Sequence, residues 1–91
     1  MRTRQVKQCG LLRAVFSEYN VSQEELAGAI GRSREYVNPR MTGKQSWTLD
    51  DVYDIRAFVN SFVDDGDPEI ISLENIAAYF PPRKRLPVKT R

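Results

Sequence analysis

The chain has 91 residues, of which 41% are hydrophobic and 29% are charged, and its formal net charge is +2. These values predict one soluble globular domain whose core is barely large enough to fold without cross-links. Cys9 is the only cysteine and histidine is absent, which excludes an internal disulfide and a Cys/His zinc site. No apolar run approaches the roughly 18 residues of a membrane span, and no signal peptide is present, so we expect a cytoplasmic protein.

Charge is unevenly distributed along the chain. Residues 1–47 carry eight Lys and Arg against four Asp and Glu, whereas residues 48–80 carry one cation against eight acids. Residues 81–91 then carry five cations and no acid. One end of the folded protein should therefore be positive and the other negative. This is typical either of a protein that meets a polyanion with one face or of charged ends that only maintain solubility.

Apolar spacings of three and four predict an all-α fold. A first helix is expected over roughly residues 4–19, ended by Asn20. At the start of the second helix, Ser22 and Glu25 have the spacing of a capping box, and Gly31 stands where a left-handed C-cap would end that helix. The residues expected to face the core from these two helices are Val6, Cys9, Leu12, Phe16, Tyr19, Leu26, Ala27 and Ile30.

Similar signals predict the remaining helices. Ser33 caps a third helix, and Thr48 with Asp51 starts a fourth that extends to about Val63. The core-facing residues expected on these two helices are Val37, Met41, Val52, Ile55, Phe58, Val59 and Phe62.

The sequence DDGDP predicts a turn, and a last helix follows from about Pro68 or Ser72 to Phe80. Residues 1–80 thus form one compact five-helix bundle, and residues 81–91 are expected to be a flexible basic tail.

The stretch QEELAGAIGRSREYV, residues 23–37, joins two of these short helices through a glycine-containing turn. This arrangement predicts a helix-turn-helix over residues 22–41. Ala27 is small where the third helix must cross closely, and Gly31 accepts the left-handed backbone of the turn. The pattern resembles that of the phage Cro and CI repressor family, also called the Xre-type family. The matching positions are Gln23, Leu26, Ala27, Ile30, Gly31, Ser33 and Val37.

The downstream segments MTGK and WTLDDVYDI extend the resemblance, which covers residues 4 to about 62. It implies a fold of the lambda-repressor-like DNA-binding type. It also implies that the third helix, residues 33–41, enters the major groove of double-stranded DNA while the second helix lies across the backbone.

The resemblance implies that three residues contact the edges of DNA bases. Arg34 opposes the helix dipole at the first helical position, so local stability does not explain it. There it could bond guanine, a contact worth about 1–3 kcal/mol of discrimination. Glu35 either favours the helix N-terminus or accepts a hydrogen bond from cytosine. Asn38 lies one turn beyond Arg34 and could pair with adenine.

Phosphate contacts are expected on both flanks of the third helix. Gln23 matches a family glutamine that bonds the DNA backbone and often braces the recognition helix. Tyr36 either presses on a sugar-phosphate or thymine methyl, or is a half-buried surface ring. About six neutralised phosphates would give a slope near −5 for log K against log salt. The other expected backbone contacts are Arg32, Ser33, Arg40, Thr42, Lys44, Gln45 and Ser46.

Two positions depart from the family pattern. Pro39 falls inside the third helix, where a proline costs about 3 kcal/mol. We therefore expect the helix to kink or end near Asn38, with residues 40–43 as a looser turn. Arg32 stands where the family usually buries an apolar residue, which predicts a more exposed turn.

The basic residues at each end of the chain have two possible roles. The N-terminal cations could form an arm against a groove and the C-terminal cations could follow phosphates, or both ends could simply be solvated. The residues concerned are Arg2, Arg4, Arg83, Lys84 and Arg85.

The sequence thus predicts a small phage- or prophage-type transcriptional regulator that binds operator DNA near the bacterial nucleoid. The starting Met1 and the lack of a large second domain favour a Cro-like protein or a minimal repressor. A homodimer through the last helix is a further expectation. No cofactor, metal, small-molecule ligand or membrane contact is expected.

Two other classes of function compete with this prediction. A protein-interaction bundle of the same fold, such as an antitoxin, would explain the acidic residues 48–80 and the many apolar residues after residue 69. An enzyme is disfavoured, because the chain has no histidine, no nucleophile–base pair and no glycine-rich phosphate loop.

Overall fold

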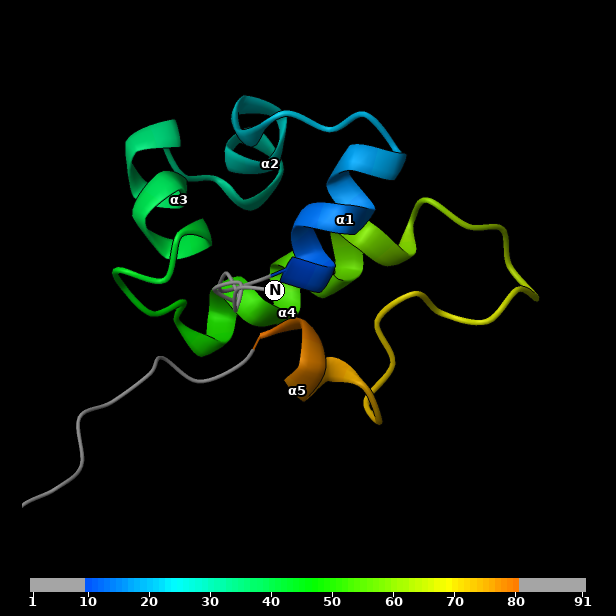
Figure 1. Ribbon diagram of the computed structural model, residues 1–91. Coiled ribbons are helices and arrows are strands. Elements are labelled where there is room, and N and C mark those ends of the chain that lie inside the picture. The colour runs from blue at the N-terminus through cyan, green and yellow to red at the C-terminus, as the bar shows by residue number, and fades with distance from the viewer. Residues whose placement is uncertain (1–9, 81–91) are drawn as a thin grey trace, which may run out of the picture.

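The computed structural model describes residues 10–80, and within that range the protein is all-helical, as predicted, with no strand. Five helices wrap around a single core in this range (Figure 1). The predicted start of the first helix, Val6, Cys9 and the basic ends lie outside the described residues, so Arg2, Arg4, Arg83, Lys84 and Arg85 are not placed. The helices are α1 (Gly10–Glu18), α2 (Gln23–Ile30), α3 (Arg34–Met41), α4 (Leu49–Asn60) and α5 (Ile76–Tyr79).

Both predicted capping boxes are present. At α2, the backbone N–H of Ser22 donates to the Glu25 carboxylate at 2.9 Å, and the N–H of Glu25 donates to the Ser22 hydroxyl at 3.0 Å. At α4, Thr48 and Asp51 form the same reciprocal pair at 3.2 and 3.1 Å. Each box satisfies two backbone donors that the first turn of a helix leaves unpaired. These helices therefore begin where their polar side chains specify.

The turn between α2 and α3 is also as predicted. Gly31 ends α2 in the left-handed conformation, with φ at 72°. The next N–H, of Arg32, donates to the Ala27 carbonyl at 2.8 Å and so satisfies a free carbonyl at the helix end. Ala27 itself is 3% exposed, and α2 packs against both α3 and α4. A larger side chain at Ala27 would separate these helices.

The sequence predicts that Pro39 either kinks α3 or ends it near Asn38, and the second alternative is wrong, because the helix continues through Pro39 to Met41. A proline keeps a helical φ and removes only the donor that would pair with the Glu35 carbonyl. Val37 and Met41, on either side of Pro39, are 0% and 2% exposed. Burying each such side chain contributes about 1.5–3 kcal/mol, so together they offset the cost of an interior proline, about 3 kcal/mol.

The chain leaves α3 through a closed turn. The Pro39 carbonyl accepts hydrogen bonds from the backbone N–H groups of Lys44 and Gln45, at 2.8 and 3.2 Å. It also accepts one from the Thr42 hydroxyl at 3.1 Å. Gly43 supplies the positive φ of 86° that this turn requires. The turn begins after Met41, two residues later than expected, and its backbone is hydrogen-bonded to the helix that it leaves.

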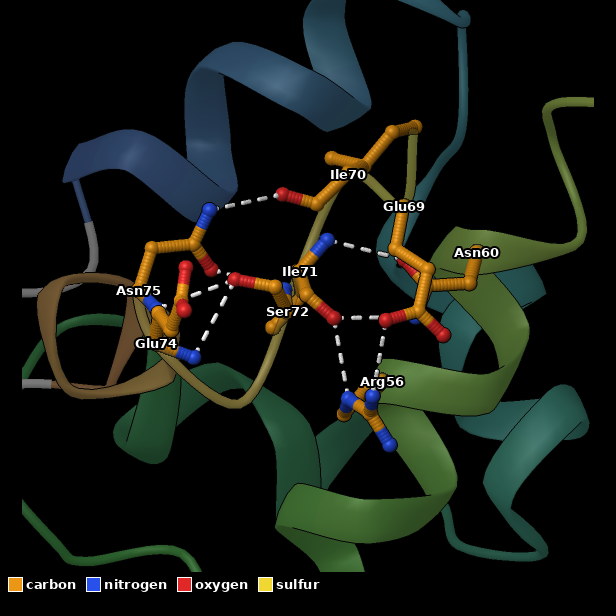
Figure 2. A network of polar contacts seen from close by, with 8 residues as sticks. All are labelled: Arg56, Asn60, Glu69, Ile70, Ile71, Ser72, Glu74 and Asn75. Atoms are coloured by element: carbon orange, nitrogen blue, oxygen red, sulfur yellow. Dashed lines mark hydrogen bonds and ion pairs between the residues drawn. The ribbon is translucent and has the colours of Figure 1, made fainter. Parts of the chain in front are cut away.

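α4 ends at Asn60 and not at the predicted Val63, because the Asn60 side chain is bonded to the chain that follows. Its amide accepts from the N–H of Ile71 at 2.8 Å and donates to the carbonyl of Ile71 at 2.9 Å (Figure 2). Arg56 donates to the same carbonyl at 2.9 Å and to the Glu69 carboxylate at 3.0 Å. The loop over residues 61–75 is thereby fastened to α4.

The predicted last helix is much shorter than expected, since α5 has only four residues. Ser72 does make capping bonds, donating its N–H to the Asn75 side chain at 2.8 Å and accepting the Asn75 N–H at 3.1 Å. However, the backbone of Asn75, at φ −109° and ψ 5°, is not helical. The Asn75 side chain also donates to the Ile70 carbonyl at 3.2 Å. A hydrogen-bonded turn therefore replaces the first half of the expected helix.

The core agrees with the predicted faces except at their edges. Leu12 and Phe16 of α1 are buried, Val15 joins them, and Tyr19 is 40% exposed with its ring against Phe62. The predicted core residues that are only partly buried are Val52, Phe58 and Phe62. The buried apolar residues are Leu12, Val15, Phe16, Leu26, Ala27, Ile30, Val37, Met41, Ile55, Val59 and Ile71.

The apolar residues after residue 69 mostly belong to this core. Ile71 is fully buried, whereas Leu73 is 68% exposed. The apolar excess that suggested a surface for a partner is therefore largely used by the protein itself. The remaining members, which are partly buried against the core, are Ile70, Ile76, Tyr79 and Phe80.

Candidate nucleic-acid interface

The solvent-facing side of α3 carries the three residues predicted to contact bases. Arg34, Glu35 and Asn38 are all exposed. Together with Pro39 they line a shallow, open hollow. Within residues 10–80, Arg34 and Glu35 form no hydrogen bond or ion pair with a protein group. Their charged groups are therefore available to a ligand.

Asn38 is held in place by the neighbouring helix. Its amide nitrogen donates to the side-chain oxygen of Gln23, at the start of α2, over 3.1 Å. The bracing contact expected of Gln23 is therefore present. The bond leaves the Gln23 amide nitrogen and the Asn38 amide oxygen free, so this pair still offers donors and acceptors on the exposed side.

Ser33 begins α3 as its N-cap. Its hydroxyl accepts the N–H of Tyr36 at 3.1 Å. The hydroxyl proton remains free to donate to an acceptor outside the protein. Arg34, at the first helical position, lies beside the positive end of the helix dipole, which is unfavourable for a cation. No protein anion in the described part of the chain compensates it.

A buried carboxylate joins α3 to α4. Asp51 is 1% exposed and accepts hydrogen bonds from the Tyr36 hydroxyl and from Nε of Arg32, the latter at 3.1 Å. The same side chain also completes the capping box with Thr48. Three donors thus face the two oxygens of this carboxylate, and a buried anion requires such hydrogen bonds.

The hydrogen bonds at Asp51 set its ionisation. Burial by itself raises the pKa of Asp51, but hydrogen bonds from Tyr36, Thr48 and Arg32 outweigh it and leave the pKa below its usual value. On the other side of the ion pair, the hydrogen bond to Asp51 raises the pKa of Arg32. The pair is therefore fully charged across the physiological pH range.

Two guanidinium groups make cation–π contacts with the Tyr36 ring. The guanidinium carbon of Arg40 lies 3.6 Å from the ring centroid, and that of Arg32 lies 4.3 Å from it. Arg40 also donates to the Tyr36 carbonyl at 2.9 Å and to the Ser46 carbonyl at 3.1 Å. We name Arg32, Tyr36, Arg40 and Asp51 the Tyr36 brace. Three residues predicted to contact the DNA backbone thus have well-defined partners within the protein.

α1 supports α3 at its other end. Nη2 of Arg13 donates to the carbonyl of Met41, in the last turn of α3, at 3.3 Å. A cation at this position also faces the negative end of the helix dipole. Arg13 and Met41 are 28 residues apart, so no local pattern in the sequence indicates this contact.

The exit from α3 presents further polar groups. Thr42, Lys44, Gln45 and Ser46 are all exposed. The Thr42 hydroxyl bonds the Pro39 carbonyl, and the Ser46 carbonyl accepts from Arg40. The ammonium group of Lys44 has no ion-pair partner in the described part of the chain. Lys44 is thus the simplest candidate for a phosphate contact.

The predicted charge separation has a spatial counterpart in residues 10–80. This range carries six Lys and Arg and twelve Asp and Glu, and four of the six cations fall within residues 32–44. The acidic loop at residues 64–69 lies on the opposite side of the molecule from α3 (Figure 1). The cations are therefore concentrated around α3, although acids are in excess over the range as a whole.

The structure thus brings Gln23 of α2 and Asn38 of α3 together and exposes Arg34, Glu35 and the polar residues of the α3 exit. Sequence reasoning recognised Asp51 only as a helix cap. A signal for its second role was the position of Arg32, since a cation at a turn residue that is usually apolar requires a partner. No group of three or more metal-ligating side chains occurs in residues 10–80, and none of the helices described there is long and apolar enough to cross a membrane.

Comparison with protein families, curated proteins and solved structures finds no match to this chain.

Proposed function

We propose that this protein binds double-stranded DNA sequence-specifically, as a small cytoplasmic transcriptional regulator of the phage Cro and CI type. In this proposal, α2 and α3 form a helix-turn-helix of the lambda-repressor-like kind, and α3 enters the major groove. Arg34, Glu35 and Asn38 contact bases. Gln23, Ser33 and Lys44 contact phosphates, and the basic residues 81–91 act as a tail that adds affinity.

The observation that best supports the proposal is that Arg34 is exposed and unpaired within residues 10–80. It is exposed at the N-terminus of α3, where the helix dipole disfavours it, and it has no partner within residues 10–80. An external anion or a guanine edge would supply the missing acceptor. Glu35 beside it adds an acceptor for a cytosine amino group, so the pair suits a G·C-containing site.

The packing of α2 and α3 supports the same function. The small Ala27 and the left-handed Gly31 bring the two helices close together, and Asn38 is fixed to Gln23. A helix that reads bases must be held rigidly enough to distinguish one hydrogen-bonding pattern from another. α3 has such support at both ends.

The decisive experiment is selection of a random duplex library by the full chain, followed by titration of the recovered sequence and a scrambled control at several salt concentrations. The proposal predicts a defined motif, a clear preference over the control, and a slope near −5 for log K against log salt if about six phosphates are contacted. Absence of binding to any duplex at low salt would refute it. The symmetry of the motif would report whether two copies bind.

A protein-interaction function is the second candidate, and two observations favour it. Acids outnumber cations in residues 10–80, and Leu49 and Tyr53, one turn apart on α4, are 67% and 51% exposed. Such a module would show no duplex binding at low salt. A homodimer, for which Leu73 is the most exposed apolar residue near α5, would appear as a concentration-dependent mass in analytical ultracentrifugation.

A further inference from the structure

We infer that the Tyr36 brace sets the direction in which α3 presents its base-reading residues, so that Arg32 and Arg40 are positioning residues and not phosphate contacts. This inference rests on the proposed function, because it concerns how the same surface selects its DNA. It replaces the expectation, drawn from the sequence, that these two arginines contact the DNA backbone.

The apolar anchor of α3 is too small to fix its orientation. Only Val37 and Met41 of its eight residues are buried. Two side chains four residues apart define one line of contact, about which a short helix can still tilt or rotate. Polar contacts must therefore supply the remaining constraint, and within the Tyr36 brace the bond from Tyr36 to Asp51 lies in the first turn of α3, which carries Arg34.

The brace constrains α3 from two directions. The Tyr36 hydroxyl is bonded to Asp51 in the first turn of α4, which is itself fixed by its capping box. Arg40 joins the Tyr36 carbonyl to the Ser46 carbonyl and so connects the middle of α3 to the loop before α4. The Tyr36–Asp51 and Arg40–Ser46 bonds therefore connect α3 to two points outside the helix.

Both arginines use part of their hydrogen-bonding capacity within the protein. Arg32 bonds Asp51 through Nε and lies against the Tyr36 ring, and Arg40 bonds two backbone carbonyls and also stacks on this ring. Stacking and forked hydrogen bonding are properties of a planar guanidinium that an ammonium group cannot reproduce. A phosphate, in contrast, accepts a hydrogen bond from either arginine or lysine. This chemical difference separates the two roles.

The test compares Arg40→Lys with Arg40→Gln on the selected duplex and on the scrambled control, across a salt series, well below the unfolding temperature of each variant. The inference predicts that both variants lower the ratio of specific to non-specific affinity by about tenfold, the equivalent of weakening one base contact. It also predicts that the salt slope of Arg40→Lys is unchanged. The inference is overturned if Arg40→Lys keeps the wild-type ratio of affinities and Arg40→Gln has a salt slope about one unit shallower. That result would make Arg40 a phosphate contact.

Lys44 and Tyr36 provide the controls. Lys44→Gln should make the slope about one unit shallower, because one phosphate contact is lost from both duplexes. Tyr36→Phe keeps the ring but removes the bond to Asp51, and it should lower the ratio at unchanged slope. If Tyr36→Phe lowers only the unfolding temperature and the ratio stays constant, the brace is purely stabilising and the inference fails.

A measurement without DNA separates this inference from the proposed function. Residual dipolar couplings in the free protein report the orientation of α3 relative to α4. They should change for α3 in Arg40→Lys and remain constant for α1, α2 and α4. Unchanged α3 couplings would overturn the inference. If the wild type selects no duplex, the proposed function fails, and these couplings alone decide whether the brace orients α3.

Discussion

The phenol of Tyr36 in α3 donates a hydrogen bond to Asp51, the residue that completes the capping box of α4. The same carboxylate accepts from Arg32 and from the backbone of Thr48. One side chain, 1% exposed, therefore links the first turns of two helices. A substitution there removes a helix cap and a helix–helix contact together.

Replacing Asp51 with alanine should lower the free energy of unfolding by about 3 kcal/mol. Loss of the helix cap costs about 1 kcal/mol. The buried donors that lose their acceptor cost about 1–3 kcal/mol more. Urea unfolding followed by circular dichroism measures the total loss. Asp50→Ala is the matched control, because Asp50 is exposed in the same turn and contributes less than about 1 kcal/mol through the helix dipole. Equal losses for the two variants would show that the network adds nothing to stability.

Stability should depend on acid pH through Asp51. Burial raises the pKa of this carboxyl, but the hydrogen bonds from Tyr36, Thr48 and Arg32 lower it more, so its pKa in the folded state lies below the unfolded value of about 3.9. The resulting stabilisation is complete above the unfolded pKa and is lost as the pH falls through the folded pKa. In Asp51→Asn, which has no carboxyl to protonate, the unfolding free energy should therefore decrease less than in wild type between about pH 5 and pH 2. Parallel curves for the two proteins would contradict this.

Arg34→Ala should remove the site preference without affecting the fold. Because Arg34 has no protein partner within residues 10–80, the unfolding temperature should be unchanged or slightly raised as an unfavourable dipole interaction is lost. Binding to the selected duplex should weaken by about 1–3 kcal/mol at a G·C pair, with little change on the scrambled duplex. Competition titrations give both values. Selectivity equal to wild type would exclude Arg34 from base reading.

Substitution by alanine should have opposite effects on stability at Gly28, inside α2, and at Gly31, in the turn that follows it. Gly31 has a φ of 72° and no neighbouring atom that a Cβ would meet, so Gly31→Ala should cost about 1–2 kcal/mol for backbone reasons alone. Gly28 is exposed inside the helix, also with open space around it, so Gly28→Ala should stabilise by about 0.5–1 kcal/mol. Thermal unfolding of both variants, alone and combined, tests the prediction. The same sign for both would be inconsistent with the observed backbone.

Short-range signals in the sequence predicted most of the fold. Ser22 with Glu25, Thr48 with Asp51, and Gly31 act over three or four residues, and each has the predicted structural role. The errors occurred where distant contacts override a local tendency. Pro39 remains helical because Val37 and Met41 are buried on both sides of it.

The same limit applies near the C-terminus and at the candidate site. α4 and α5 are shorter than predicted because Asn60 and Asn75 bond the backbone of the intervening loop, which their spacing in the sequence does not reveal. At the site, the exposed positions of α3 followed from helical periodicity and the family resemblance. The contacts of Arg13, Arg32 and Arg40 with partners on other elements required three-dimensional structure.

The attachment of the loop after α4 has a practical consequence. Arg56 and Asn60 hold this loop through the main chain of Ile71, so the attachment does not require particular side chains earlier in the loop. Gly66, at φ 96° and with open space around it, is exposed within the loop of residues 64–69, and this loop lies on the side opposite α3 (Figure 1). Exposed loops of this kind tolerate added residues well. A fluorophore or an affinity peptide inserted at Gly66 would leave the α3 surface unobstructed, which makes this the preferred position for immobilising the protein in binding assays.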